Sequence, residues 1–309
     1  MVDFSKFNSL IQLTFYFNSN DKCIRFLEKE RWNNEPVCPY CGSVHTYKRK
    51  NEHRYKCADY NSSFSVLVGT IFENTKISLV KWFMAMYLLS CHKKGISSHQ
   101  LAKDIHVTQK TAWFILHKIR TLLSQETSII EGEAECDETY IGGKETNKHE
   151  CKRTPNTQGR SLKTKTAVFG IADRNGGIIA KKVLNTSSKT LGDLIRLHVK
   201  PNSRIFTDEY IGYNSLKESE YKHQFVYHKN KEHSDGNGVH TNTIEGFWSH
   251  LKRMIFGTYH FVSSVYLQRY VDESVFRYNT STYKSGERFE MMLKKSIGKV
   301  SYSQVRMAS

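Results

Sequence analysis

Apolar side chains recur at two different spacings along this chain, and the spacings divide it into parts. Between residues 76 and 125 they return every three or four positions, in one series from Leu79 to Leu89 and a second from Ala112 to Leu122. This is the spacing of amphipathic helices. Residues 36–75 instead form short strand-like pieces between turn residues. The pattern predicts a small β module followed by a helical region.

The sequence SSHQLAKDIHVTQKTAW, which joins the two helical series, carries two helix-capping signals. A serine precedes one short helical stretch, and Thr108 precedes the next. Short helix, tight turn and longer helix are the helix-turn-helix pattern, in which the second helix reads the bases. We therefore expect DNA contacts from Thr108, Lys110, Thr111 and Lys118.

After residue 126 the order of the elements changes. The pattern predicts three antiparallel strands, then a helix, two strands in turn and two long amphipathic helices, at about 133–142, 166–174, 178–184, 188–199, 204–210, 223–228, 242–255 and 264–279. This is the order of a ribonuclease H-like domain with a mixed sheet. The sequence thus predicts an α+β multidomain protein, divided into residues 1–75 with a zinc-ribbon-like module, a helix-turn-helix region at 76–125, a ribonuclease H-like domain at 126–285 and a C-terminal tail at 286–309.

The charge of the chain indicates what kind of partner it binds. Lysine and arginine number 46 against 30 acidic residues, so the formal net charge is +16. A folded chain this basic usually meets a polyanion, and nucleic acid is the leading candidate. Part of the excess lies in residues 144–165, which carry seven Lys/Arg against two Glu. We interpret this segment as a mobile basic loop that contributes Lys163 and Lys165 to DNA binding, with a solvated linker as the alternative.

Apolar runs and cysteines bear on where the protein works. The longest apolar runs, Leu10–Phe17 and Leu79–Cys91, are shorter than the roughly 18 residues that a membrane-spanning helix needs. Seven cysteines are an odd number, and several crowd into one short segment, which favours metal-binding or packed thiols over a disulfide scaffold. The chain opens without a basic-then-apolar leader. We therefore expect a cytoplasmic, nucleoid-associated protein with no membrane partner.

Cys38 and Cys41 belong to a CPYCG knuckle, in which two thiolates stand three residues apart on a turn. Cys57 is the obvious third ligand, but the position three residues later, where a paired ribbon would have its fourth cysteine, is Tyr60. The candidates for a fourth ligand are His45, His53 and Asp59. The sequence predicts a zinc site here, and a ribbon that has lost its zinc is the alternative.

A ribonuclease H-like sheet in a basic chain raises the question of carboxylates that hold divalent metal ions for phosphoryl transfer. Alternation along the first strand places Glu133, Glu135 and Asp137 on one face and Glu138 on the other. Asp137 is the nearest of its set to the end of the strand, and Asp208 follows an apolar strand. Both are candidate ligands, and a solvated acid at a strand end is the alternative for either alone.

The helix predicted from residue 242 carries a third candidate acid. Glu245, Trp248 and Lys252 recur at intervals of three and four beside the apolar face, so the carboxylate and the lysine share one stripe. Asn242 stands three residues before Glu245. The two also fit a capping box, in which Glu245 would only reach back to the start of the helix. The residues alone leave both interpretations open.

Five stretches carry a recognisable family pattern: GTIFENTKISLVKWF, TAWFILHKIR, CDETYIGGK, TDEY and HTNTIEGFWSHLKRMIFGTYHFVSSVYLQRYVDESVFRYN. Together they resemble bacterial insertion-sequence transposases of the DDE class, the group related to eukaryotic Merlin elements. The resemblance covers about residues 20–285. It implies a zinc ribbon and a helix-turn-helix that bind element ends, and a ribonuclease H-like catalytic domain that uses Mg²⁺ or Mn²⁺. Its partners would be terminal inverted repeats and target DNA, bound by a homo-oligomer.

Carried over by position, the resemblance implies a metal-binding acidic triad of Asp137, Asp208 and Glu245, followed by Lys252 as a basic residue. Some members of the group have asparagine in place of the third acid, which makes Asn242 the alternative. The predicted function is binding of insertion-sequence ends with metal-dependent DNA cleavage and strand transfer. Two alternatives are a catalytically inactive, domesticated transposase that acts as a DNA-binding regulator, and a ribonuclease H-like nuclease without strand transfer.

Overall fold

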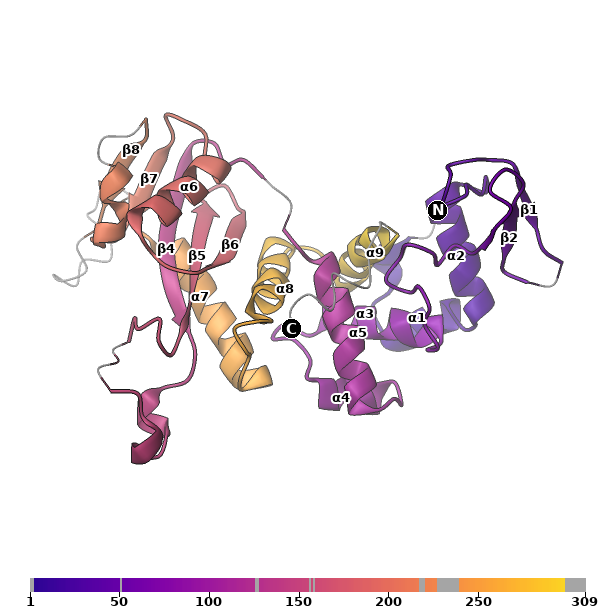
Figure 1. Ribbon diagram of the computed structural model, residues 1–309, viewed down its shortest axis with the longest axis horizontal. Coiled ribbons are helices and arrows are strands. Elements are labelled where there is room, and N and C mark those ends of the chain that lie inside the picture. Colours follow the sequence, from indigo (N-terminus) through magenta and orange to yellow (C-terminus); the bar gives the residue numbers. More distant parts are fainter. Residues whose placement is uncertain are drawn as a thin grey trace. The chain divides into compact units, whose positions relative to one another are not determined.

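A computed structural model describes residues 3–50, 52–125, 128–155, 157, 159–216, 220–226 and 239–297 (Figure 1). The chain divides into two compact units. One consists of Met1–Leu123 with Ser281–Ser309, and the other of Ser124–Thr280. Helices and two separate sheets make up these units, which confirms the α+β multidomain fold expected from the sequence.

The first unit begins with helices that the hydrophobic pattern did not predict. A 3₁₀ turn at Phe4–Lys6 is followed by α1 (Leu10–Tyr16) and α2 (Asn20–Trp32). Ser9 and Ser19 start the two helices by accepting hydrogen bonds from backbone N–H groups. Three short antiparallel strands come next, β1 (Thr46–Lys48), β2 (Tyr55–Cys57) and β3 (Ser63–Phe64). They form the predicted β module.

Three helices form the helix-turn-helix region of this unit, namely α3 (Leu79–Cys91), α4 (Ser98–Asp104) and α5 (Gln109–Leu122). The two predicted capping signals act as expected, because Ser97 accepts from the Gln100 N–H and Thr108 from the Thr111 N–H. The turn between α4 and α5 contains a left-handed residue, His106, with φ of 49°. The predicted order of short helix, turn and longer helix is therefore present.

Part of the segment that we expected to be a C-terminal tail folds into the first unit. Helix α9 (Ser285–Ser296) buries Phe289, whose ring lies 6.5 Å from that of Phe17 and 6.0 Å from that of Phe83, centroid to centroid. Residues 298–309 of the expected tail lie outside the described residues. Helix α9 thus belongs to the core of the first unit rather than to a tail.

The second unit contains a five-stranded mixed sheet in the order β6-β5-β4-β7-β8. Strands β4, β5 and β6 pair antiparallel, whereas β4 with β7 and β7 with β8 pair parallel. This is the ribonuclease H-like topology that the sequence predicts. The bounds are β4 Glu133–Ile141, β5 Thr166–Asp173, β6 Ile178–Val183, β7 Arg204–Thr207 and β8 Lys222–Phe225. Residues 227 and 228 of the last predicted strand lie outside the described residues.

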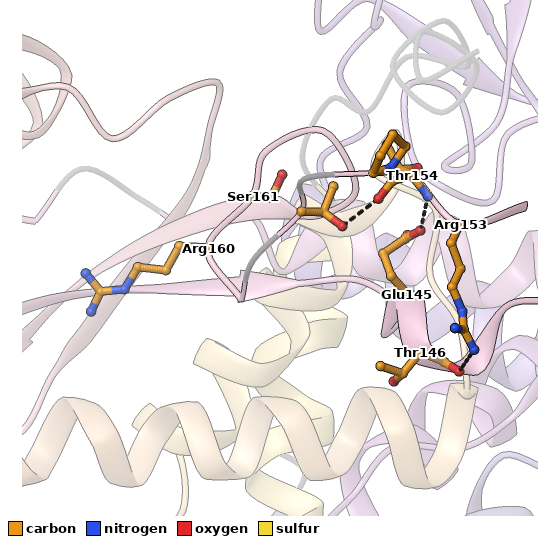
Figure 2. A pocket seen from close by; sticks show the side chains of 8 residues that line it. Glu145, Thr146, Arg153, Thr154, Arg160 and Ser161 are labelled. Atoms are coloured by element: carbon orange, nitrogen blue, oxygen red, sulfur yellow. Dashed lines mark hydrogen bonds between the residues drawn. The ribbon is translucent and has the colours of Figure 1, made fainter. Parts of the chain in front are cut away.

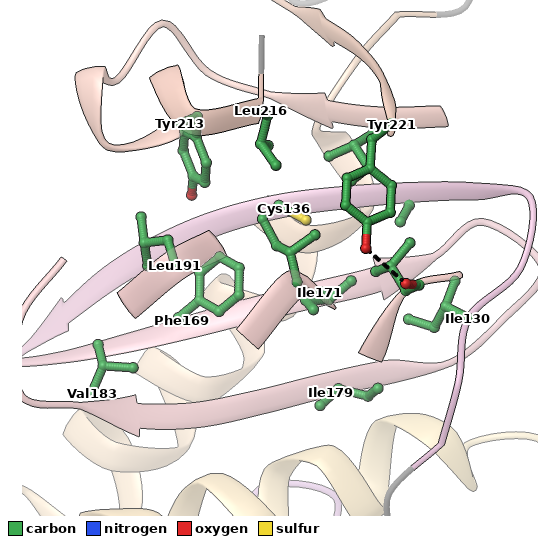
Figure 3. Close-up of a cluster of buried hydrophobic side chains, with 14 of the residues drawn as sticks. Ile130, Cys136, Phe169, Ile171, Ile179, Val183, Leu191, Tyr213, Leu216 and Tyr221 are labelled. Carbon is green, nitrogen blue, oxygen red and sulfur yellow. Dashed lines mark hydrogen bonds between the residues drawn. The ribbon is translucent and has the colours of Figure 1, made fainter. Parts of the chain in front are cut away.

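Helices cover both faces of the sheet and make two apolar cores. Helix α6 (Ser188–His198) and the 3₁₀ segment Ile211–Leu216 cover one face, in a cluster where Figure 3 shows Cys136, Ile171 and Leu191. Helices α7 (Asn242–Met254) and α8 (Leu267–Asn279), joined through a π-helical turn at Ile255–Tyr259, cover the other face. Cys136 and Ile141 of β4 lie in different cores, as the predicted alternation requires.

Helices in the described part of the chain are too short or too polar for a bilayer crossing.

Candidate active site and metal sites

The parallel ladder between β4 and β7 ends early, and this opens a gap at the carboxyl ends of the two strands. Pairing runs from Glu133 and Arg204 to Glu135 and Phe206, whereas β4 continues to Ile141. Beyond Glu135 the edge of β4 on the β7 side has no ladder partner among the described residues, and we call this break in the pairing the gap. Ligands of α/β sheets usually bind at such a place, outside the carboxyl ends of parallel strands.

Three carboxylates converge at this gap. Asp137, Glu138 and Asp208 each offer an oxygen, and these atoms all lie within 4.8 Å of one another. Asp137 and Asp208 are two of the acids that the sequence predicts. Glu138 is an acid that sequence reasoning missed as a ligand, because strand alternation places it on the face opposite Asp137. The only sequence signal is its position directly after Asp137 near the end of the strand.

The Glu138 side chain is fully buried and only half satisfied. Its Oε2 accepts a hydrogen bond of 2.9 Å from the Tyr213 hydroxyl. Its Oε1 is buried and receives no hydrogen bond from the described residues. A buried carboxylate oxygen without a donor is costly unless something else compensates its charge. Arg160 Nη1 lies 3.7 Å from this oxygen, too far for a hydrogen bond, and a divalent cation in the gap would compensate the charge more fully.

The electrostatics of the cluster also fit a divalent cation. Burial is the main cause that raises the pKa of Asp137, to about 8, and the charges of Glu138 and Asp208 add to this shift. Burial and repulsion from Asp208 likewise raise the pKa of Glu138. Mg²⁺ and Mn²⁺ prefer oxygen ligands, and their charge relieves the repulsion among carboxylates. The donor set therefore suits one or more such ions.

Helix α7 is fixed in place by Glu135, which sequence analysis had placed on the face of Asp137 without a role. The fully buried Glu135 carboxylate accepts the N–H groups of Thr243 at 2.8 Å and Ile244 at 3.1 Å. Arg174 donates to the same carboxylate at 3.1 Å. An acid at these positions stabilises the start of a helix through its free N–H groups and its dipole.

The Trp248 side chain links α7 to the carboxylate cluster. Its indole Nε1 donates to Asp137 Oδ2 at 2.9 Å. Gly170 lies opposite Asp137 in the ladder between β4 and β5. A Cβ at Gly170 would come within 2.6 Å of Trp248 Cη2 and 2.8 Å of Ile244 Cδ1. Because Gly170 has no side chain, the indole ring has room to lie against β5 and reach Asp137 on β4.

Glu245 lies one turn before Trp248 on the same side of α7 but is not among the three clustered carboxylates. Its Oε1 accepts a 2.9 Å hydrogen bond from the hydroxyl of Thr241, the N-cap residue. Asn242 is exposed as the first residue of the helix, and Lys252 is exposed one turn after Trp248. The capping box that would pair Asn242 with Glu245 does not form here, because Thr241 holds the N-cap position and Glu135 takes the free N–H groups.

The three cysteines that the sequence predicts as zinc ligands lie together. Cys38, Cys41 and Cys57 place their sulfurs within 4.8 Å of one another, and the Tyr60 N–H donates to Cys57 Sγ at 3.3 Å. Although desolvation opposes it, hydrogen bonds from the N–H groups of Tyr40 and Cys41 lower the pKa of the Cys38 thiol. Clustered thiols of this kind fit Zn²⁺.

The candidates for the fourth zinc ligand are engaged elsewhere. His53 Nε2 lies 2.7 Å from Asp21 Oδ1 on α2, and His45 Nδ1 lies 3.5 Å from Asp59 Oδ2. Tyr60 stacks its exposed ring on Tyr40, with the centroids 5.5 Å apart. Among the described residues, no histidine or acid joins the three cysteines.

The predicted DNA-binding residues of α5 separate into two groups. Thr108 and Lys110 are exposed and Thr111 is partly exposed at the start of the helix, where a recognition helix contacts bases. Lys118 is buried, and its Nζ donates to the carbonyl oxygen of Ile71 at 2.8 Å beside the Phe114 ring. This position corrects the expectation that Lys118 contacts DNA, because it lies on the side of α5 that packs into the core.

The basic loop between β4 and β5 has a folded core around Glu145 (Figure 2). Glu145 accepts from the Thr154 N–H at 2.8 Å and pairs with Lys148 at 2.6 Å. Lys165 donates to the Gly159 carbonyl at 2.7 Å, whereas Lys163 is exposed. A cavity of about 710 Å³ lies within the loop, lined by Glu145, Thr146, Arg153, Thr154, Pro155, Thr157, Arg160 and Ser161.

Known proteins resemble both units. Residues 129–279 match the ISXO2-like transposase domain, and residues 18–59 match a transposase zinc-ribbon domain. A protein of Halobacterium salinarum, named "Uncharacterized protein in transposable element ISH50", is 29% identical over 257 residues, which are 77% of this chain and 84% of that protein. An "Uncharacterized transposase-like protein" of Haemophilus influenzae is 34% identical over 103 residues, which are 33% of this chain and 81% of that protein.

These matches identify the protein as a DDE transposase of the kind that insertion sequences encode. It also has a zinc-ribbon module. The chain belongs to the ISXO2-like transposase family. The resemblance inferred from the sequence is thereby confirmed. A solved structure titled "Crystal structure of a pre-cleavage Mos1 transpososome" aligns with 96% of this chain and 98% of its own, at 11% identity and a TM-score of 0.25, which is too low to compare details.

Proposed function

We propose that this transposase binds the ends of its insertion sequence and catalyses metal-dependent DNA cleavage followed by strand transfer into target DNA. The observation that carries the proposal is the convergence of Asp137, Glu138 and Asp208 at the gap between β4 and β7. Divalent ions held there would activate the attacking oxygen and neutralise the phosphate under attack. The formal net charge of +16 supports DNA as the partner.

Each of the three carboxylates has one oxygen held by a protein donor. The Trp248 indole donates to Asp137 Oδ2, the Tyr213 hydroxyl to Glu138 Oε2 and the Tyr210 N–H to Asp208 Oδ1. These bonds orient the carboxylates before any ligand arrives, which reduces the cost of ordering them on binding. We therefore assign the metal ions to Asp137, Asp208 and, as an addition to the sequence-based set, Glu138.

Glu245 is our proposed acid on the helix side of the site. Its support is its position on the side of α7 that carries Trp248, the residue bonded to Asp137. The 2.9 Å hydrogen bond from the Thr241 hydroxyl orients its Oε1 at the start of the helix. We propose that Lys252, exposed one turn beyond Trp248, contacts a phosphate of the bound DNA.

Recognition of the element ends is assigned to the first unit. The exposed start of α5 would enter the major groove and place Thr108, Lys110 and Thr111 at base edges or phosphates. Zn²⁺ held by Cys38, Cys41 and Cys57 would keep the ribbon folded. Lys163 and Lys165, on the loop between β4 and β5, would bind the DNA backbone near the active site.

Paired substitutions decide the third acid. Glu245→Gln keeps the size and hydrogen-bonding capacity of the side chain but removes its charge. We expect it to abolish Mg²⁺-dependent cleavage, with DNA binding and Tm nearly unchanged. Asn242→Ser, at the exposed start of the same helix, should keep its activity. A dead Asn242→Ser beside an active Glu245→Gln would assign the role to Asn242 instead.

A single assay tests the function as a whole. The purified full chain is incubated with Mg²⁺, target plasmid and duplexes that carry the DNA flanking its coding sequence. Joined products support the proposal. Cut ends without joining would indicate a nuclease, and binding alone would indicate an inactive regulator.

A further inference from the structure

Arg160 reaches the carboxylate cluster from the basic loop between β4 and β5. Its Nη1 lies 3.7 Å from Glu138 Oε1, the buried oxygen that accepts no hydrogen bond from any described residue, and its Nη2 lies 3.5 Å from Asp208 Oδ2. The Arg160 side chain is 60% exposed, whereas those of Glu138 and Asp208 are 0% and 12% exposed. The guanidinium therefore faces the two acids from the solvent side of the gap.

The position of Arg160 is set by neighbours on both sides. Its Cζ lies 5.4 Å from the centre of the Tyr210 ring, and the Tyr210 hydroxyl is tied to Thr186 Oγ1 at 3.0 Å. On the loop side, the bond from Lys165 to the Gly159 carbonyl fixes the residue before Arg160. In Figure 2 the Arg160 side chain extends away from the other residues of the loop cavity.

The contacts of Arg160 with the two acids are weak enough for another cation to replace it. Strong charge-assisted hydrogen bonds measure about 2.7–2.9 Å, and both separations here are longer. A partly exposed ion pair contributes little net stability. A single positive charge also compensates only part of the charge of three carboxylates. Divalent ions with direct oxygen contacts would displace it from Glu138 and Asp208.

We propose that Arg160 is a phosphate-binding residue that changes partners: it pairs with Glu138 and Asp208 before metal ions enter, and with a phosphate of the bound DNA afterwards. The inference rests on the proposed metal site. A displaced guanidinium on a loop beside the metal ions is close to the place where the phosphate must lie. Its planar fork matches two phosphate oxygens at once, which a lysine cannot do.

The first test measures Mn²⁺ binding without DNA, by electron paramagnetic resonance of the free ion. Arg160→Ala removes the competing cation and should bind Mn²⁺ roughly 2- to 5-fold more tightly than the wild type, the effect of losing one partly exposed ion pair. Arg160→Lys keeps a competing charge and should stay near the wild type. Lys152→Ala removes an exposed charge from the same loop and serves as the control, with unchanged affinity.

The second test measures binding of a short fluorescent DNA duplex with and without Ca²⁺, which takes oxygen ligands as Mg²⁺ does. Arg160→Ala and Arg160→Lys should both weaken binding several-fold more with Ca²⁺ than without it, because only the metal-bound site frees the arginine. An Arg160→Ala variant that binds Mn²⁺ no more tightly than the wild type, or DNA losses that do not depend on Ca²⁺, would overturn the inference while leaving the metal site intact. A wild type that binds no Mn²⁺ would refute the metal site itself and this inference with it.

Discussion

Replacing Asp137 with asparagine is expected to stabilise the metal-free protein, although Asp137 lies at the centre of the proposed active site. Burial, followed by repulsion from Glu138 and Asp208, raises the pKa of Asp137 from 3.8 to about 8. Below about pH 4 the group is protonated in the folded and the unfolded chain and has no effect. Between about pH 4 and pH 8 the unfolded chain has released this proton and the folded chain has not, so the free energy of unfolding falls as the pH rises.

The size of the effect follows from the same pKa. At pH 7 the pH lies about 3.2 units above the usual pKa of 3.8. At about 1.36 kcal/mol for each pH unit, the variant can gain at most about 4 kcal/mol in the free energy of unfolding. Solvent reaches part of the Asp137 side chain, and screening reduces the gain to roughly 1–3 kcal/mol. For a unit of this size the Tm should rise by about 2–12 °C. Asparagine also keeps an oxygen that can accept the hydrogen bond from Trp248.

The assay is differential scanning calorimetry of the full chain, first without and then with Mn²⁺. Without Mn²⁺ the Asp137→Asn variant should melt above the wild type, with a larger difference at about pH 7.5 than at about pH 5.5. With Mn²⁺ the order should reverse, because only the wild type gains from binding. Asp193→Asn, which alters an exposed acid paired with Arg196, is the control and should change little. The reasoning would be refuted by an Asp137→Asn variant that melts below the wild type without metal. It would also be refuted if Mn²⁺ raised the Tm of the variant as much as that of the wild type.

Three further predictions concern the neighbourhood of the two proposed metal sites. Gly170→Ala should lower the free energy of unfolding by about 1–3 kcal/mol in calorimetry and weaken Mn²⁺ binding. The reason is that its methyl group would lie 2.6 Å from the rigid Trp248 ring. Gly177→Ala, with no atom within 4 Å of the new Cβ, is the control and should change neither property. Tyr60→Cys supplies a fourth thiolate and should hold zinc more strongly against a chelator, and an unchanged affinity would contradict a three-cysteine site. Mn²⁺ affinity should rise up to about tenfold per pH unit between about pH 6 and 8 and then level off, because the ion displaces the proton of Asp137; a flat profile in a binding titration would contradict this.

Local periodicity predicted the parts of the fold that depend on one element at a time. Alternation along β4 placed Cys136 and Asp137 on opposite faces, and the structure has Cys136 in the core beside α6 and Asp137 bonded to Trp248 of α7. Capping residues likewise located the start of α5 at Thr108. Side-chain direction in a strand and the free N–H groups of a helix are local properties, so a single sequence carries them.

The parts that the sequence did not predict depend on how distant elements meet. Glu138 reaches the same gap as Asp137 because the pairing of β4 with β7 ends at Phe206, and nothing in β4 encodes where that pairing ends. Lys118 is basic and sits on the proposed recognition helix, yet its amine is taken by the Ile71 carbonyl. Helix α9 similarly finds its core with α3, far away in the sequence. Such contacts override local patterns.

The central claim, that the cluster at the gap between β4 and β7 joins DNA ends to target DNA, is tested most directly by strand transfer in vitro. The full chain, Mg²⁺ and duplexes with the DNA flanking its coding sequence are mixed with a supercoiled plasmid, and joined molecules are detected by sequencing across the junctions. The account predicts junctions with the wild type and none with Asp208→Asn, while both proteins bind the duplexes. Junctions formed equally well by Asp208→Asn would contradict it.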